Sequence, residues 1–245
     1  MRATWNGILS TGRSEPLSLP GLAWPVELRL HPRARSLRLR LDEARGLLTL
    51  TCPRRTSRKA ALQWAQRQAA WVEEQLGRIQ PGEPLLPDKT IPFEGRNLAL
   101  VWEASLPRTP EISEDLLRCG GPEAAFSGRI ERFLRSEARA RLSAETAKAA
   151  LDAGVTVRSV SVGDASSRWG SCSASGAIRY NWRLILAPPH LLRWVVAHEV
   201  AHRRHMNHGP DFRALEAKLF GGDVSSARAE LRALGPRLKR VGRAF

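Results

Sequence analysis

The chain has 245 residues, of which 42% are hydrophobic and 26% are charged, and its formal net charge at pH 7 is +15. These proportions are typical of a globular protein with a substantial core. The sequence contains no run of about eighteen apolar residues, so it predicts no membrane span. The three cysteines are widely separated and odd in number, so we expect free thiols rather than a disulfide framework or a cysteine-based zinc site.

The N-terminal sequence contains no continuous apolar segment that would predict a secretory signal, so the expected location is the cytoplasm. Arginine supplies 34 of the 39 basic residues. Such usage often follows from GC-rich coding, and the basic residues are spread along the chain without a dense basic tail. Nucleic acid is therefore an alternative partner but not the favoured one, and phosphate contacts would carry such binding.

Residues 26–52 alternate apolar and basic side chains, and this period of two is typical of half-buried antiparallel strands. The DEARG segment that ends at Gly46 predicts a turn, because glycine readily adopts positive φ. We therefore expect Leu47–Cys52 to be the second strand of a hairpin.

A helix with Thr56 or Ser57 as its N-cap is expected to end at Gly77 or at the following Pro81. Its apolar residues recur at helical spacing, so one face of the helix must be buried. Trp64 and Trp71 belong to that apolar face, and we expect them to pack in the core rather than to stack on nucleic-acid bases.

The middle of the chain contains the expected boundary between two regions. A proline-rich connector is followed by IPFEGRNLALVW, residues 91–102, which predicts a strand or a hairpin. Residues 104–123 contain three prolines and two glycines, so we place the boundary there. We therefore expect an N-terminal strand and helix region at 20–105 and a C-terminal region at 124–245.

The C-terminal region is expected to begin with a long helix at about 124–153, rich in alanine, leucine, arginine and glutamate. Residues 155–163 and 177–188 predict two strands that pair as a hairpin across a turn-rich loop. Two consecutive prolines then introduce a helix, and further helices are expected near 210–220 and 225–234.

The helix after those prolines carries the segment VVAHEVAHRRHMNHGPDF, which contains four of the six histidines of the chain. His198 and His202 are four residues apart, so one face of a helix presents both imidazoles to a single ion. Glu199 lies about 100° around the helix, off the ion but close enough to hold a water molecule beside it. The apolar residues before His198 predict a buried helix, where solvation alone does not explain two histidines and a glutamate.

A catalytic zinc generally takes three protein ligands, and three residues are candidates for the third. His205 is seven residues beyond His198, about 10 Å along a straight helix, which is too far for one ion. His208 lies between an asparagine and a glycine, which favour a left-handed turn that returns the chain toward the helix. We favour His208 over Glu216, which lies on the following helix and stays an alternative.

The segment SRWGSCS, residues 167–173, has two interpretations. It is either a hairpin loop in which Trp169 is a plug, or a loop beside the metal in which Arg168 stabilises an oxyanion or binds an anionic substrate group. Cys172 is not favoured as a nucleophile, because it needs a free histidine as base and the histidines are assigned to the metal.

The order SRWGSCS, then a strand with Asn181, then VVAHEVAHRRHMNHGPDF resembles the YgjP-like metallopeptidase family, and is more distantly similar to the SprT-like and WLM zinc peptidases. The N-terminal strands and the segment QWAQRQAAWVEEQL resemble the opening region of that family. The resemblance implies that His198, His202 and His208 bind Zn²⁺ and that Glu199 is the catalytic carboxylate. It also implies that the bond cleaved is a peptide bond.

We therefore expect an α+β fold in which a strand-rich N-terminal part with one helix precedes a C-terminal zincin-like half, with the HExxH helix on a small antiparallel sheet. The expected function is zinc-dependent hydrolysis of a protein or peptide, with Glu199 as general base. One alternative is a zinc-dependent nucleotide phosphohydrolase, a pyrophosphatase, because the same chemistry attacks a phosphoanhydride. The other is a nucleic-acid-associated module with a structural zinc, against which an intact Glu199 argues.

Overall fold

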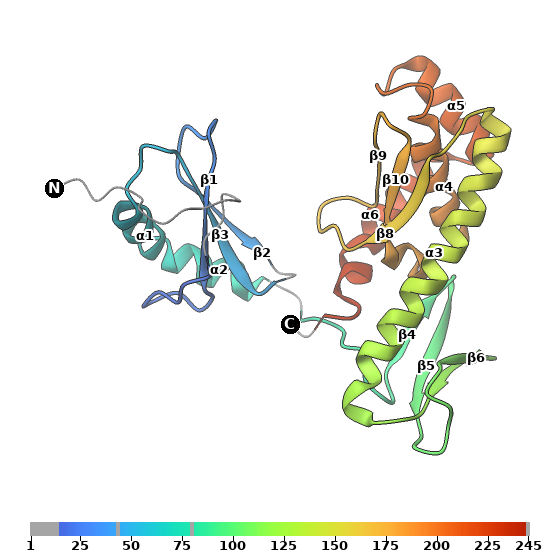
Figure 1. The fold of residues 1–245 in the computed structure, drawn as a ribbon, viewed down its shortest axis with the longest axis horizontal. Coiled ribbons are helices and arrows are strands. Elements are labelled where there is room, and N and C mark those ends of the chain that lie inside the picture. Colours follow the sequence, from blue (N-terminus) through green and yellow to red (C-terminus); the bar gives the residue numbers. More distant parts are fainter. Residues whose placement is uncertain (1–14, 43–44, 79–80, 244–245) are drawn as a thin grey trace. The chain divides into compact units, whose positions relative to one another are not determined.

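The computed structural model describes residues 15–42, 45–78 and 81–243. The chain divides into two compact units, one ending at Pro81 and the other beginning at Gly82 (Figure 1). The boundary expected in residues 104–123 therefore differs from the observed division. That segment lies inside the second unit, because it contributes two strands to a sheet there.

The first unit contains a three-stranded sheet of β1, β2 and β3, which span Val26–Leu30, Arg38–Asp42 and Leu47–Cys52. The strand order is β1-β3-β2. β2 and β3 form the predicted antiparallel hairpin, with Gly46 at a φ of 59° in its turn. β1 pairs with β3 in parallel, so the expectation of antiparallel strands is wrong for β1. The chain reaches β3 only after passing through β2, and this longer connection permits parallel pairing.

The helices of the first unit are α1, Arg58–Gln66, and α2, Ala69–Gly77. They replace the single helix expected from the sequence. Ser57 caps α1, because its hydroxyl accepts a hydrogen bond from the Ala60 N–H at 3.2 Å. Trp64 packs against the core between the helices and the sheet, whereas Trp71 is 38% exposed. The prediction of core tryptophans is thus confirmed for Trp64 only.

The second unit begins with a four-stranded sheet of β4 (Thr90–Phe93), β5 (Arg96–Trp102), β6 (Glu111–Ser113) and β7 (Leu116–Cys119). The strand order is β4-β5-β7-β6. β4 and β5 form the hairpin that residues 91–102 predict. β6 and β7 form a second hairpin inside residues 104–123, so the prolines and glycines there bracket strands of one sheet.

The long helix α3 spans Phe126–Ala153, as the sequence predicts, after a 3-10 turn at Glu123–Ala125. Buried residues recur at every fourth position from Phe126 to Ala150, so one stripe of the helix faces the core. Gly154 ends the helix in the left-handed conformation, with a φ of 61°. α3 runs past both sheets of the second unit and packs against β8 and α4 (Figure 1).

The second sheet of this unit contains β8 (Ser159–Gly163), β9 (Gly170–Cys172) and β10 (Ala177–Asn181) in the order β8-β10-β9. β8 pairs with β10 in parallel and β9 pairs with β10 antiparallel, so the sheet is mixed rather than antiparallel. The predicted hairpin of β8 with β10 is wrong, because the four residues between β9 and β10 close a hairpin there instead. Residues 182–186 form a 3-10 helix, η2, and do not continue the strand.

Three helices complete the second unit: α4 over Pro189–Ala201, α5 over Pro210–Phe220 and α6 over Val224–Arg240. α4 begins at the predicted proline pair, α5 has its predicted bounds, and α6 extends beyond the predicted residue 234. α4 is largely buried among α3, α5, α6 and β9. None of the helices in the described ranges combines the length and the apolarity that a bilayer span requires.

Candidate metal centre

The helix α4 carries His198 and Glu199 and ends just before His202, which is its C-cap residue. The chain then forms turns and no further helix before α5. The straight helix assumed for His205 is therefore wrong, because His205 lies beyond the end of α4. Its backbone carbonyl, rather than its ring, accepts a hydrogen bond from Nδ1 of His202 at 3.1 Å.

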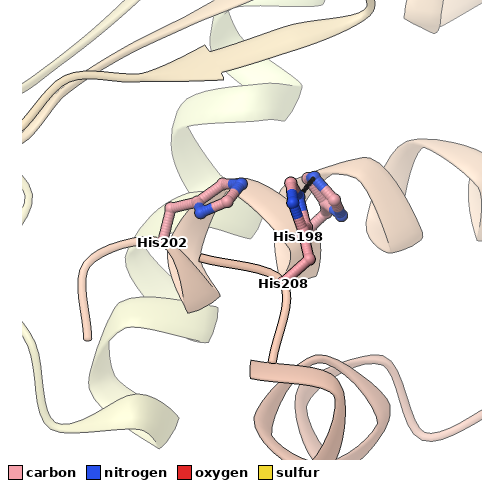
Figure 2. Close-up of side chains that lie close together, drawn as sticks. All are labelled: His198, His202 and His208. Atoms are coloured by element: carbon pink, nitrogen blue, oxygen red, sulfur yellow. Dashed lines mark hydrogen bonds between the residues drawn. The ribbon is translucent and has the colours of Figure 1, made fainter. Parts of the chain in front are cut away.

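The side chains of His198, His202 and His208 point toward one another (Figure 2). One nitrogen from each ring lies within 4.8 Å of the others, and the Nε2 atoms of His198 and His208 are 3.3 Å apart. His208 comes from the turn between α4 and α5, but neither of its neighbours has positive φ, so the expected left-handed turn is wrong. Gly209 has a φ of −70° and caps α5, and Pro210 occupies the first turn of that helix as predicted.

Hydrogen bonds fix which nitrogen of two rings faces the centre of the cluster. Nδ1 of His198 lies 2.9 Å from Oε1 of Glu216, and Nδ1 of His202 lies 3.1 Å from the carbonyl oxygen of His205. Carboxylate and carbonyl oxygens only accept, so both Nδ1 atoms carry a proton, which leaves Nε2 of each ring as the nitrogen that can bind a metal. Burial lowers the pKa of His202, which favours the neutral ring that binds metals.

Phe212, on the first turn of α5, supports all three rings. Its ring centroid lies 5.1 Å from that of His198, 4.6 Å from that of His202 and 4.7 Å from that of His208. Its side chain is buried, so one fixed aromatic ring restricts the motion of three imidazoles. The sequence pattern did not single out Phe212, although it closes the histidine-rich segment.

Glu216, the alternative third ligand, lies behind His198 and not in the cluster. Its side chain is 1% exposed, and its Oε1 accepts hydrogen bonds from Nε1 of Trp194 at 3.0 Å and from Nδ1 of His198. Burial raises the pKa of this carboxyl, but the two hydrogen bonds and the nearby Arg228 outweigh burial and hold its pKa below the ordinary value. Glu216 is therefore an ionised acceptor that orients His198.

Glu199 is 5% exposed and packs against β9. Burial raises its pKa to about 7, although the charges of His198 and Arg168 oppose the shift. Gly170, the first residue of β9, makes this packing possible, because an added Cβ would lie 2.6 Å from Cγ of Glu199. Nothing in the local sequence pattern indicated that Gly170 packs against this carboxylate.

A cavity of about 470 Å³ opens beside two of the three histidines and Glu199. Its lining combines apolar side chains with three arginines, Arg168, Arg213 and Arg228. Arg168 is exposed, and its charge lowers the pKa of Glu199. The structure therefore brings the SRWGSCS segment beside the histidine cluster, where the functional interpretation of that segment required it to be.

The segment before β9 is anchored to the region around α6. Arg183 is 2% exposed and pairs with Asp164, which lies at the start of this segment. Nζ of Lys239, on α6, lies 4.9 Å above the ring of Trp169, close enough for a cation–π contact. Trp169 also packs against the core, as the plug interpretation expected. These contacts hold in place the chain segment that lines the cavity.

The three cysteines are free thiols in the structure, as expected. Cys172 lies in β9, next to the site. Burial raises the pKa of its thiol, with Glu199 adding to the shift and Arg203 opposing it. A raised pKa disfavours the reactive thiolate, so the structure adds no support for Cys172 as a nucleophile.

The donor set fits a metal ion that prefers imidazole. His198, His202 and His208 each offer one nitrogen to a common centre, and zinc takes such a set of three while keeping a fourth position for water. Two of the rings are oriented through their other nitrogen, which is typical of metal-binding histidines. The three side chains could therefore hold a metal ion without rearrangement of the backbone.

Comparison with known families gives one match. Residues 35–234 match the family model described as YgjP-like, metallopeptidase domain. The matched range contains the histidine cluster, Glu199, Glu216 and the residues that line the cavity. No curated protein and no solved structure gives a significant match to the chain.

Proposed function

The chain belongs to the YgjP-like metallopeptidase family, and from this membership and the geometry of the histidines we propose that it is a zinc-dependent metallopeptidase. The observation that carries the proposal is the convergence of His198, His202 and His208 beside the nearly buried carboxyl of Glu199. On this proposal the second unit is zincin-like, with the HExxH helix α4 packed against a mixed sheet through β9.

In the proposed mechanism His198, His202 and His208 would hold zinc, and the bound ion would supply Lewis acidity that makes water nucleophilic near neutral pH. Glu199 accepts a proton from the attacking water at one carboxylate oxygen and delivers it to the leaving amine. Gly170 leaves the space that the carboxylate occupies between α4 and β9.

We assign Arg168 the role of binding negative charge that develops on the substrate carbonyl. Arg168 lines the same cavity as Glu199 and His198, and its exposed guanidinium is free to reach a substrate there. The apolar part of the lining, which includes Val195 and Leu231, suits a substrate side chain. These features support a protein or peptide substrate.

A zinc-dependent nucleotide phosphohydrolase is the second candidate, and one observation favours it. Arg168, Arg213 and Arg228 line the cavity, and three guanidinium groups beside a metal suit a chain of phosphates. Family membership favours the peptidase. A binding module with a structural zinc is the weakest candidate, because burying Glu199 costs desolvation energy and a structural metal site has no use for a base.

A parallel substrate screen tests the proposed function. The purified chain is stripped of metal, reloaded with zinc, and offered denatured proteins and nucleoside triphosphates in separate reactions. The proposal expects new amino termini that appear only with zinc. Zinc-dependent release of phosphate or pyrophosphate alone would replace the peptidase by the second candidate, and tight zinc binding without any hydrolysis would favour the structural role.

A further inference from the structure

The basic residues of the first unit are segregated from its acidic residues. Residues 28–41 and 45–72 contain eleven basic side chains and no acidic side chain. Protein surfaces normally intersperse both signs, so this segregation produces a local positive field that the net charge of the chain does not reveal. The fold of the first unit decides where those charges lie.

The register of the first sheet places three arginines on one face. Arg29 of β1 and Arg38 of β2 both pair with Thr51 of β3, so the three side chains form a row across the sheet. Arg40 pairs with Thr49 two residues along, on the same face. We call Arg29, Arg38, Arg40, Thr49 and Thr51 the basic face. Standard strand geometry puts Arg29 about 10 Å from Arg38, and Arg38 about 7 Å from Arg40.

The basic face is the open side of this sheet. The alternate strand residues point the other way and pack with Ala61, Ala65 and Val72 of the two helices. The arginines of the basic face are all exposed. Among the residues that the structure describes, none of these three arginines forms an ion pair, so their charges are available to a ligand.

The acidic residues of this side of the sheet are already paired. Glu27 and Asp42 lie farther along this side of the sheet than the row that contains Thr51. A carboxylate oxygen of each lies close to a guanidinium nitrogen of Arg45, at 2.8 Å for Glu27 and 3.9 Å for Asp42. Arg45 therefore offsets charge at one end of the face, and at the other end no carboxylate of the described residues forms an ion pair with Arg29 or Arg38. The positive charge is concentrated at the Thr51 end.

More cations lie in the segments that leave this same end. β1 and β3 are parallel and end together at Leu30 and Cys52. The connections that follow them, and the first turn of α1, carry further exposed basic side chains: Arg33, Arg35, Arg54, Arg55, Arg58 and Lys59. Strand pairing thus gathers at one end of the unit charges that are spread over 31 sequence positions, from 29 to 59.

We propose that the basic face and the cations at its Thr51 end bind the phosphodiester backbone of nucleic acid. Arginine pairs with phosphate oxygens through two parallel N–H groups, and threonine hydroxyls donate to the same oxygens. The strands hold these donors at fixed spacing, so several phosphates are contacted at once. The basic face contains no aromatic side chain, so the binding follows the backbone and does not read bases by stacking.

The chemistry of the face fits nucleic acid better than a membrane or an acidic protein. Membrane-surface elements add apolar side chains that enter the lipid, whereas the row of Arg29, Thr51 and Arg38 contains no apolar side chain. Interfaces with proteins generally have an apolar core, which this face also lacks. The inference does not rest on the proposed peptidase activity, because it concerns the first unit alone.

The test is a salt titration of nucleic-acid binding by the full chain, followed by fluorescence anisotropy. The probes are labelled single-stranded RNA, single-stranded DNA and duplex DNA of about 20 nucleotides, with phosphatidylserine vesicles and polyglutamate as comparison ligands. The variant Arg29→Gln/Arg38→Gln/Arg40→Gln is compared with Arg132→Gln/Arg139→Gln/Arg232→Gln, a triple variant that removes the same charge from exposed helix positions of the second unit. Thermal unfolding checks that both variants fold, and Arg38→Gln alone provides a milder change.

Wild type is expected to bind at least one nucleic acid more tightly than either comparison ligand. The basic-face variant should bind at least about tenfold more weakly at 100 mM salt. The plot of the logarithm of the binding constant against the logarithm of the salt concentration should be less steep by about 2 to 3 for this variant, and by about 1 for Arg38→Gln. The second-unit variant should bind nearly as wild type does. Equal losses in the two triple variants, or tighter binding to vesicles or polyglutamate, would overturn the proposal.

Discussion

Nδ1 of His198 donates a hydrogen bond to Oε1 of Glu216 across 2.9 Å, so a buried carboxylate on α5 orients a histidine on α4. The same oxygen accepts a second hydrogen bond from Trp194 on α4. Arrangement of the histidine cluster therefore depends on the packing of α5 against α4, as well as on the HExxH spacing within α4. We therefore expect Glu216 to influence metal affinity even though it is not in the cluster.

Glu216→Gln should weaken zinc binding by about 10- to 100-fold in a chain that still folds, because the amide lacks the negative charge that polarises His198. Competition with a chromogenic chelator measures the affinity. Glu230→Gln is the matched control, since Glu230 lies 2.7 Å from His190 in a more exposed pair away from the cluster. Unchanged zinc affinity in Glu216→Gln would show that the carboxylate does not tune His198.

His208→Ala should lose most of its zinc, as should His198→Ala and His202→Ala, because each removes one of three converging nitrogens. His205→Ala should keep its zinc, since the hydrogen bond from His202 goes to the backbone carbonyl of His205, which the substitution retains. Metal content of the four purified variants, measured by mass spectrometry, tests both expectations. Normal zinc in His208→Ala would remove His208 from the ligand set, and zinc loss in His205→Ala would contradict a backbone-only role.

Gly170→Ala should reduce hydrolysis by about 10²-fold while zinc content stays near normal. The added Cβ would lie 2.6 Å from Cγ of Glu199, so the carboxylate has to move away from its position beside the histidines. Gly77→Ala is the control, because an added Cβ there meets no atom within 4 Å. If Gly170→Ala is as active as the control, the close packing of β9 on Glu199 is not needed for catalysis.

Local sequence signals predicted the elements of the second unit better than their pairing. Prolines marked the starts of α4 and α5, and the richness in alanine, leucine, arginine and glutamate predicted α3. Alternation identified β8 and β10 as strands, but alternation does not encode strand direction. The parallel pairing of β8 with β10 depends on β9, a three-residue strand too short for any periodic signal.

The candidate site shows the same difference between features that are local in the sequence and contacts that form only in the folded chain. His198, Glu199 and His202 are neighbours in sequence, so their spacing alone predicts a shared position on one helix. Gly170 and Phe212 come from other elements, and their contacts with Glu199 and with the histidine rings exist only after α4, α5 and β9 have packed. Contacts of this kind cannot be predicted from spacing.

The pH dependence of stability should change in Glu199→Gln when the protein is free of metal. The pKa of Glu199 is about 7 in the folded chain and is near 4.5 when unperturbed, so the folded state binds the proton more tightly. The free energy of unfolding of wild type should therefore fall as pH rises from about 4.5 to 7, by on the order of 2 kcal/mol, relative to the variant. Urea unfolding in chelator at pH 5 and pH 8 measures the difference. Parallel pH profiles would contradict a raised pKa.

The most direct test of the account is Glu199→Gln, with zinc content and hydrolysis measured on the same preparation. Glutamine keeps the size of the side chain and its hydrogen-bonding capacity but cannot accept the proton of the attacking water. The account predicts normal folding and zinc content, with hydrolysis of the substrate found in the parallel screen lower by about 10²-fold or more. Full activity in a zinc-loaded Glu199→Gln variant would contradict the account, and loss of its zinc or its fold would make Glu199 a structural residue instead.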